Sequence, residues 1–229
     1  MRRRTSLRLK RAFRHARPTH IVKKRLTRSV IERYAEKIGL VYLGYVDQRD
    51  DDHRLIRGHT VSATHQDNHY CIGTVRGYDV MLALRNDVVR VRSGQEKRCH
   101  WLIYAIDLHA NVEVPNFYLG HRNRDDVFAA SFRPMQPLAV TSLGQYPAKF
   151  VADYAVYGSA ANLLPVGQII SPQVAEVIAT RFQGVSAEVE DNTLHLYTEA
   201  ARPTEAQLDK MLSNGLWLAE VIDTIVAAK

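Results

Sequence analysis

Four side chains of metal-ligand type alternate along the segment ATHQDNHYC, residues 63–71: His65, Asp67, His69 and Cys71. On an extended strand, side chains two residues apart point to the same face, so all four would share one face. Imidazole, carboxylate and thiolate groups together suit Zn²⁺. This pattern predicts a metal site, and with it a metal-dependent hydrolase that uses His65, Asp67 and His69.

The geometry of a straight strand limits that prediction. Same-face neighbours lie about 6.5–7 Å apart at Cα, so two consecutive ligands can share one ion but four cannot converge. A third ligand would have to come from elsewhere, and the candidates are His59, His100 and His121. In the alternative interpretation, residues 65–68 form a polar turn and Cys71 is a small buried residue. We expect no cofactor and keep Zn²⁺ as the alternative.

Other catalytic motifs are absent from the sequence. It contains no P-loop, no G-x-G-x-x-G, no G-x-S-x-G, no H-E-x-x-H, no C-x-x-C and no deaminase pair of H-x-E with P-C-x-x-C. The commonest nucleotide-binding proteins, serine hydrolases, zinc proteases and nucleobase deaminases are thereby excluded. Whether the protein is an enzyme stays undecided at this point.

The net charge of +7 is distributed unevenly along the chain. Residues 1–33 hold thirteen Lys and Arg and one acidic residue, a net charge of +12. Residues 34–229 hold eighteen basic and twenty-three acidic residues, a net charge of −5. A block of like charge repels itself and rarely packs into a core. We therefore expect a basic arm that is disordered alone, or helical against an anionic partner.

The basic arm has a weak helical pattern. Leu9, Ala12, Phe13 and Ala16 lie on one face of a helix, and Pro18 ends the run. A basic amphipathic segment binds nucleic acid or lies on an acidic membrane surface. The alternative is a tail with no single partner, or one that folds back on the acidic body. The cations expected to contact an anionic partner are Arg2, Arg3, Arg4, Arg8, Lys10, Arg11, Arg14, Arg17, Lys23, Lys24 and Arg25.

Cysteine usage and hydropathy indicate a compartment. Two isolated cysteines, Cys71 and Cys99, suit a reducing cytoplasm rather than a disulfide framework. The basic start is not followed by the apolar segment of a signal peptide. The apolar-rich runs, such as WLIYAI at 101–106, are too short to cross a bilayer. We expect a cytoplasmic protein without a transmembrane segment, peripheral to the membrane if the arm binds lipid.

The body begins with a helix signal and continues with strands. Ser29 and Glu32 fit a capping box, and Gly39 is a natural C-cap. Strand-like runs follow from residue 40 to residue 157, including KFVADYAVY at 149–157. Strands with no helices between them favour an antiparallel sheet.

The last sixty residues predict a helix, a hairpin and a second helix. Ser171 is an N-cap before an amphipathic helix, and residues 185–198 alternate as two strands about a turn at Asp191-Asn192. Residues 202–228 form a long amphipathic helix that contains Gly215. We therefore expect residues 1–28 to be a basic arm. Residues 29–229 are expected to form a single α+β domain, a mostly antiparallel sheet covered by C-terminal helices.

This C-terminal pattern resembles a bacterial family of unknown function. The matching segments are FVADYAVYG, IISPQVAEVIATRF, VSAEVEDNTLHLY and PTEAQLDKMLSNGLWLAEVID, with GTVRGYDVMLAL and VPNFYLGHR placed as sheet strands, roughly residues 70–226. The resemblance implies an α+β domain, often in a membrane-associated context, and implies no activity. The chain departs from the family's frequent layout because the basic arm stands where a hydrophobic membrane segment is usual.

Two functions follow from these observations. The first is a non-enzymatic binding or scaffolding module whose basic arm contacts an anionic partner, either nucleic acid or a membrane surface. The alternative is the metal-dependent hydrolase built on the histidine-rich segment. The metal content of the purified protein separates them.

Overall fold

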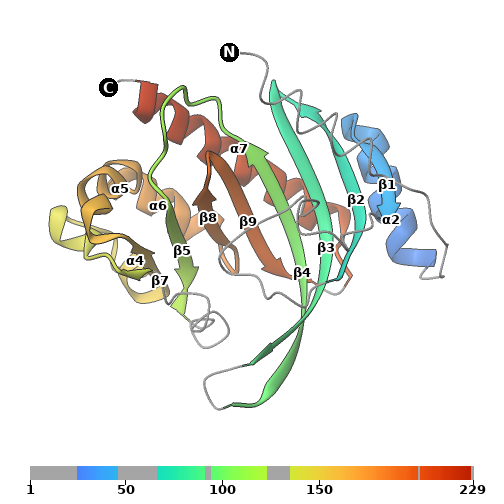
Figure 1. The fold of residues 1–229 in the computed structure, drawn as a ribbon, viewed down its shortest axis with the longest axis horizontal. Coiled ribbons are helices and arrows are strands. Elements are labelled where there is room, and N and C mark those ends of the chain that lie inside the picture. Colours follow the sequence, from blue (N-terminus) through green and yellow to red (C-terminus); the bar gives the residue numbers. More distant parts are fainter. Residues whose placement is uncertain (1–24, 46–65, 91–93, 123–134, 201, 228–229) are drawn as a thin grey trace.

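The structure is a computed structural model that describes residues 25–45, 66–90, 94–122, 135–200 and 202–227. Nine strands form one sheet in the order β1-β2-β3-β4-β9-β8-β5-β7-β6 (Figure 1). Every neighbouring pair in this order is antiparallel. The predicted α+β class and the mostly antiparallel sheet are confirmed.

The elements have the following bounds. The strands are β1 (Val41–Tyr45), β2 (Gln66–Val75), β3 (Tyr78–Arg90), β4 (Glu96–Asp107), β5 (Phe117–His121), β6 (Gln136–Pro137), β7 (Tyr154–Gly158), β8 (Ser186–Glu190) and β9 (Thr193–Glu199). The helices are α2 (Arg25–Ile38), α4 (Ala148–Asp153), α5 (Leu163–Ile169), α6 (Pro172–Arg181) and α7 (Glu205–Ala227), with the 3₁₀ turns η3 (Val140–Leu143) and η4 (Ala160–Asn162).

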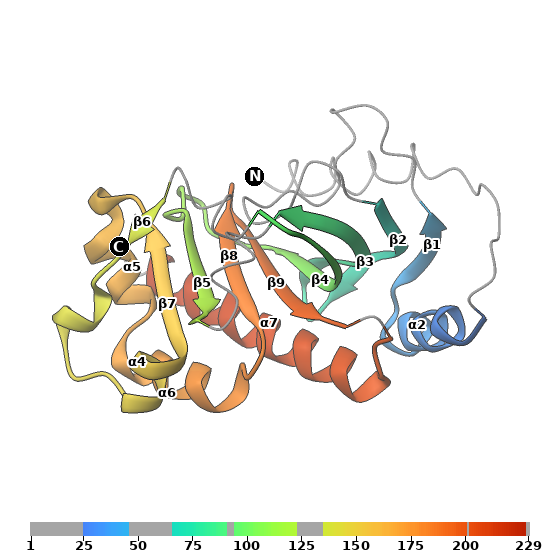
Figure 2. The ribbon, with the colours of Figure 1, turned by 90° about the horizontal axis from the view of Figure 1, so that it is seen from below.

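Helices cover one face of the sheet. Figure 2 shows α7 running under the middle of the sheet, with α2 at one end and α4, α5 and α6 at the other. Alternation along β4 divides the core: Leu102, Tyr104 and Ile106 join the large cluster under the helices. Trp101 and Ile103 join a smaller cluster on the opposite face. The predicted cover of C-terminal helices is confirmed.

Gly215 lets α7 lie directly on the sheet. A Cβ at this position would sit 2.6 Å from Leu196 Cδ1 in β9 and 2.7 Å from Ile106 Cδ1 in β4. The helix continues without a break through this residue. Its weak helix propensity is therefore offset by closer packing between α7 and the sheet.

The first helix begins earlier than the sequence predicts. α2 starts at Arg25, so Ser29 lies inside the helix and the predicted cap is wrong. Arg28 and Glu32, one turn apart, form an ion pair of 3.3 Å that favours the additional turn. The predicted end is confirmed, because Gly39 has a φ of +80°, the left-handed conformation of a helix C-cap.

The strand predicted over 149–157 is half helix. Residues Ala148–Asp153 form α4, and only Tyr154–Gly158 form β7. Pro147 stands at the N-cap of α4, and Lys149 Nζ lies 2.6 Å from Asp153 Oδ2 one turn later. These local interactions outweigh the strand propensity of the segment.

Both short hairpins are closed by two residues with positive φ. Arg76 and Gly77 join β2 to β3 with φ values of 50° and 84°. Asp191 and Asn192 join β8 to β9 with φ values of 50° and 57°. Two-residue turns of this kind match the right-handed twist of the strands, and the turn predicted at Asp191-Asn192 is confirmed.

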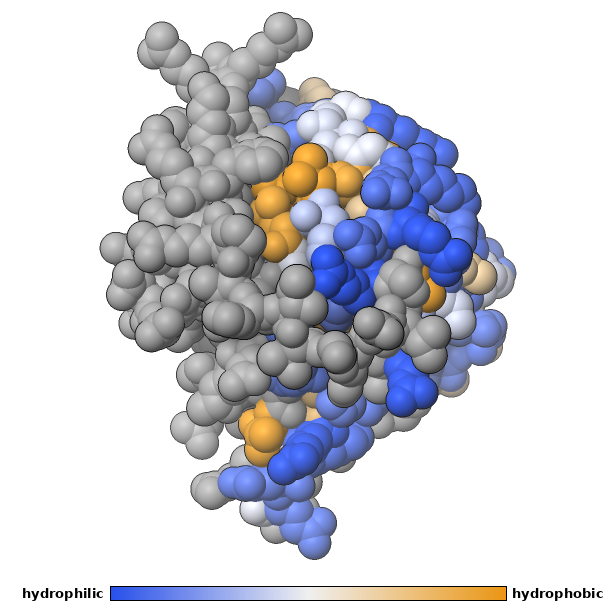
Figure 3. All heavy atoms as spheres, turned by 90° about the vertical axis from the view of Figure 1, so that its right-hand side faces the viewer, coloured by the Kyte–Doolittle hydropathy of each residue, from blue (hydrophilic) through white to orange (hydrophobic). Residues whose placement is uncertain are grey.

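The edge strand β1 carries an exposed apolar side chain. Val41 is 46% exposed. Figure 3 shows the side of the molecule on which α2 and β1 lie, where hydrophobic patches stand among hydrophilic residues. β1 is also irregular, because its register with β2 slips on either side of Gly44. Such irregularity opposes the addition of another strand at this edge.

Within the described ranges, no helix taken singly is long and apolar enough to cross a membrane. The segments Ala160–Ile169 and Pro172–Arg181, which are bent by 75° at their junction, pass on length and composition when they are taken together.

Candidate functional site

The basic arm lies almost entirely outside the residues that the structure describes. Of the predicted contact cations, only Arg25 falls within them, as the first residue of α2. The next cation, Arg28, belongs to the body: its guanidinium pairs with Glu32 and lies 5.9 Å from the centre of the Tyr42 ring. Contact between the arm and an anionic partner therefore stays a prediction.

The histidine-rich segment forms β2, and the strand is irregular at its centre. His65 lies outside the described residues, and the side chain of Asp67 is not described. His69 has a φ of 56°, and the pairing with β3 slips by one residue between Asn68 and Cys71. This β-bulge interrupts the alternation on which a shared ligand face depends.

The two described members of the segment already have interactions of their own. His69 Nδ1 lies 2.8 Å from the hydroxyl of Tyr42. The thiol of Cys71 is fully buried, and its Sγ donates to the carbonyl of His69 over 3.5 Å. Burial raises the pKa of the Cys71 thiol from its ordinary 9.0 to about 12, which disfavours the thiolate that a metal requires.

Among the described residues, no group of three or more His, Cys, Asp or Glu side chains is arranged to hold a metal ion. His100, a candidate third ligand, places Nδ1 2.7 Å from Asn86 Oδ1. His121, another candidate, packs edge-on against Tyr154. Because His59 and His65 lie outside the described residues, the zinc site remains a prediction.

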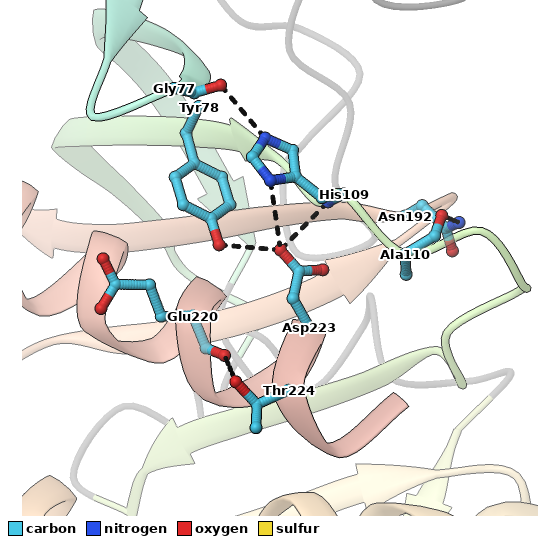
Figure 4. A network of polar contacts seen from close by, with 8 residues as sticks. All are labelled: Gly77, Tyr78, His109, Ala110, Asn192, Glu220, Asp223 and Thr224. Atoms are coloured by element: carbon cyan, nitrogen blue, oxygen red, sulfur yellow. Dashed lines mark hydrogen bonds and ion pairs between the residues drawn. The ribbon is translucent and has the colours of Figure 1, made fainter. Parts of the chain in front are cut away.

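A polar network joins three distant parts of the chain at Asp223 of α7 (Figure 4). Asp223 Oδ2 accepts a hydrogen bond of 2.8 Å from the Tyr78 hydroxyl and one of 3.1 Å from the backbone N–H of His109. The rings of Tyr78 and His109 stack with centroids 4.1 Å apart and planes 2° apart. Tyr78 begins β3, and His109 follows the end of β4.

The hydrogen bonds of this network assign the histidine tautomer. His109 Nε2 lies 3.1 Å from the carbonyl of Gly77, which can only accept, so Nε2 carries the proton. His109 Nδ1 lies 4.0 Å from Asp223 Oδ2, beyond hydrogen-bond range. Burial, followed by the bond to Asp223, raises the pKa of Tyr78 above its ordinary value, so the phenol stays a donor.

The Asp223 network fastens the end of α7 to the sheet. Asp223 Oδ2, the Tyr78 hydroxyl and His109 Nε2 each bond to another part of the same protein, so these atoms hold structure. Asp223 Oδ1 is buried without a hydrogen-bond partner among the described residues. No local pattern in the sequence predicts this network, because Tyr78 and Asp223 are 145 residues apart.

The turn residue Asn192 organises the neighbouring connection between β4 and β5. Its Oδ1 accepts from the N–H of Val114 over 2.8 Å, and its Nδ2 donates to the carbonyl of Val112 over 2.9 Å. Asn192 favours the left-handed backbone conformation that the tight turn needs. Its side chain also holds the loop between β4 and β5, some eighty residues earlier in the chain.

The sheet face opposite the helices carries a second polar group. Tyr118, Glu188 and His195 are cross-strand neighbours on β5, β8 and β9. The Tyr197 hydroxyl donates to Glu188 Oε2 over 3.1 Å, and both residues are buried. Buried carboxylates require such donors. Because Glu188 has no exposed surface, we interpret this group as part of the interior rather than as an open site.

Comparison with known proteins identifies the fold. No family model matches the sequence, and no curated protein matches it. The crystal structure of the mycobacterial trehalose monomycolate transport factor A, TtfA, is similar, with a TM-score of 0.58, 16% identity, and coverage of 89% of this chain and 96% of that chain. The two proteins share a fold. At this identity the likeness shows the fold alone.

Proposed function

We propose that this protein is a non-enzymatic binding module that residues 1–28 hold at an anionic membrane surface. The observation that carries the proposal is the net charge of +12 in residues 1–33 against −5 in the rest of the chain. An acidic body is repelled by an anionic surface, so the arm supplies the electrostatic attraction. Each Lys or Arg near such a surface contributes about 1 kcal/mol.

Two arguments favour a membrane over nucleic acid as the partner. Leu9 and Phe13 give the arm apolar side chains that can enter the boundary between headgroups and acyl chains. The neighbour of like fold is named as a trehalose monomycolate transport factor. The family that residues 70–226 resemble implies a context that is often membrane-associated. Binding to nucleic acid is the competing outcome of the test.

The polar groups of the body support a binding role rather than catalysis. In the Asp223 network, the hydroxyl of Tyr78 and the Nε2–H of His109 are both engaged within the protein. Glu188, on the opposite face of the sheet, is bonded by Tyr197 and buried. The bonded atoms of both groups thus hold the fold, and we assign no catalytic step to them.

The experiment is a salt titration of binding to anionic phosphatidylglycerol vesicles, neutral phosphatidylcholine vesicles, duplex DNA and structured RNA. The test variant replaces Arg2, Arg3, Arg4 and Arg8 by Gln. The matched control replaces four exposed cations of the body, Arg76, Lys97, Arg98 and Lys210, by Gln.

We expect the arm variant to bind anionic vesicles at least tenfold more weakly, because four contributions of about 1 kcal/mol are removed. The control should bind as the parent protein does or more weakly by a small factor. Equal affinity of the arm variant and the parent would refute the proposal. Binding to DNA or RNA that survives physiological salt, with no vesicle binding, would assign the arm to nucleic acid.

A further inference from the structure

One stretch of the chain is almost without charge. Residues 134–175 contain two side chains of the Asp, Glu, Lys, Arg or His types, Lys149 and Asp153. At the chain's average charged fraction of 24%, the same length would hold about ten. The two that are present bond to each other, with Lys149 Nζ 2.6 Å from Asp153 Oδ2. We call residues 134–175 the low-charge end.

The fold gathers this stretch at one end of the molecule. It contains β6, η3, α4, β7, η4 and α5, which lie together at the left of Figures 1 and 2, at the end opposite α2. In the strand order, β7 and β6 close this side of the sheet, and β1 closes the other. The residues of the low-charge end, which are consecutive in the sequence, therefore also lie together in space.

Exposed apolar side chains are concentrated at the low-charge end. Six large hydrophobic residues are exposed among those that the structure describes, and three of them lie here: Leu164 at 64%, Leu143 at 44% and Val151 at 42%. Leu164 is the most exposed of the six.

Leu143 and Leu164 belong to one surface. The side chain of Leu143, in η3, lies against Gly167 of α5, where a Cβ would collide with Leu143 Cδ1. Gly167 follows Leu164 by three residues, so both lie on the same side of α5. The missing side chain of Gly167 therefore lets Leu143 pack against α5, one turn of helix from Leu164.

The surface around these leucines is neutral. Thr141, Ser142, Gln145, Ala160, Ala161 and Gln168 are exposed there. The hydroxyl of Tyr146 already donates to the carbonyl of Ile170 over 2.7 Å. Transfer of these uncharged side chains out of water avoids the cost of dehydrating a charge, which is the largest penalty for entering a lipid boundary.

We infer that the low-charge end is a second membrane contact, which inserts Leu143 and Leu164 into the boundary between headgroups and acyl chains. The inference rests on the proposed function only for the class of partner. The arm binds by charge, whereas this end binds by burial of apolar surface. One contact is therefore sensitive to salt and to lipid charge, and the other is sensitive to neither.

Composition favours a bilayer over a protein at this surface. Protein interfaces draw their strongest contacts from Trp, Tyr and Arg, with Leu under-represented. Among the described residues, the large exposed hydrophobic side chains of the low-charge end are Leu and Val. Leucine among neutral residues suits the lipid boundary.

Both contacts can reach one bilayer. Nine strands at a spacing of about 4.8 Å separate α2 from the low-charge end by roughly 40 Å. The 24 residues before α2 span at most about 80 Å when they are extended. The arm can therefore bind the membrane that the far end of the body touches.

The test measures binding to neutral phosphatidylcholine vesicles at high salt, where the arm's attraction is screened. The variants are Leu143→Ser, Leu164→Ser and the double substitution. The control is Val112→Ser, because Val112 is 58% exposed but lies in the connection between β4 and β5. We expect each leucine variant to bind about tenfold more weakly, the double variant to bind more weakly still, and the control to be unchanged.

A fluorescence measurement locates the contact. Cysteine introduced at Leu164 and labelled with an environment-sensitive dye should shift to shorter wavelength on neutral vesicles, whereas the same dye at Ala206 of α7 should not. Cys71 and Cys99 are buried, so labelling is selective for the introduced thiol. Thermal unfolding of each variant checks that the fold is kept.

The outcomes separate this inference from the proposed function. Loss of anionic-vesicle binding in the arm variant together with unchanged neutral-vesicle binding supports both. Absence of neutral-vesicle binding by the parent protein, or binding that the double variant retains, overturns the second contact and leaves the arm untouched. A dimer in sedimentation that Leu164→Ser dissolves would also overturn it, by showing that the surface joins two copies of the chain.

Discussion

The two ends of the sheet are closed by different chemistry. At the α2–β1 end, Lys37 of α2 bonds to Glu205 of α7 over 2.6 Å, and both side chains are more than half exposed. At the low-charge end, the rings of Tyr146, Phe150 and Tyr154 pack in series, with centroids 5.8 and 5.6 Å apart. The first contact is an exposed ion pair, whereas Phe150 and Tyr154 of the second are buried in the core. The α2–β1 end is therefore joined to α7 by an ion pair at the surface, whereas the low-charge end is held by aromatic packing in its interior.

The largest expected effect comes from the helix that spans both ends. Gly215→Val would force α7 away from Leu196 and Ile106, because a Cβ alone is already too close to both. We expect a loss of about 3 kcal/mol in the free energy of unfolding, typical of severe overpacking. Ser213→Val, at an exposed position of the same helix, controls for β-branching. Equal urea midpoints for the two variants would contradict the close packing.

The next effect compares a hydrogen bond to a charge with one to a neutral group. Tyr78→Phe removes the bond to the Asp223 carboxylate, and Tyr146→Phe removes the bond to the carbonyl of Ile170. We expect losses of about 2 kcal/mol and about 1 kcal/mol, because bonds to charged groups are the stronger. Chemical denaturation measures both. A larger loss for Tyr146→Phe would reverse the comparison.

The α2–β1 end should weaken at alkaline pH. Burial raises the pKa of the Cys71 thiol from 9.0 to about 12, so the folded protein keeps a proton that the unfolded chain has lost. The free energy of unfolding therefore falls as pH rises from about 9 to about 12, by up to about 1.4 kcal/mol per pH unit for this group. Urea unfolding at a series of pH values should show a shallower fall for Cys71→Ala. An identical slope would exclude Cys71 as a contributor.

A small effect is expected from the exposed ion pair. The Glu205 carboxylate, through its hydrogen bond, raises the pKa of Lys37, but both groups are open to solvent. Exposed pairs of this kind contribute little to stability. We expect Lys37→Ala to leave the thermal midpoint within experimental error, at low and high salt alike. A clear loss that salt abolishes would mean that charge holds this end together.

No effect on metal content is expected from His69→Ala. Elemental analysis of the purified protein should find no stoichiometric zinc before or after the substitution, since His69 Nδ1 is occupied by Tyr42 and the Cys71 thiol keeps its proton. One equivalent of zinc, lost in the variant, would instead show a metal site that includes His69 and would favour the hydrolase alternative built on His65, Asp67 and His69.

Local patterns predicted local structure well. The turn at Asp191-Asn192, the cap at Gly39 and the helix after Ser171 depend on neighbouring residues, and all three are confirmed. Ser171 Oγ accepts from the N–H of Val174 over 3.4 Å, as an N-cap should. Each of these features is decided within a few residues of the chain.

The predictions that were wrong, and the features that sequence reasoning did not find, have two physical causes. At the Ser29 cap and at α4, one local preference outweighed another of similar size, through the pairs Arg28–Glu32 and Lys149–Asp153. The bulge at His69 and the Asp223 network depend on partners in other elements. Periodicity along one segment carries no information about a neighbouring strand that joins it from elsewhere in the chain.

The strand order also determines at which point of synthesis all strands of the sheet can pair. β8 and β9, the last strands to be synthesised, lie between β4 and β5. A chain that ends before Ser186 would expose the unpaired backbone of β4 and of β5 at once, and exposed edges of this kind pair with other molecules. During synthesis the two halves of the sheet must therefore wait for residues 186–199 before β4 and β5 find their partners, and α7 follows to cover the completed sheet.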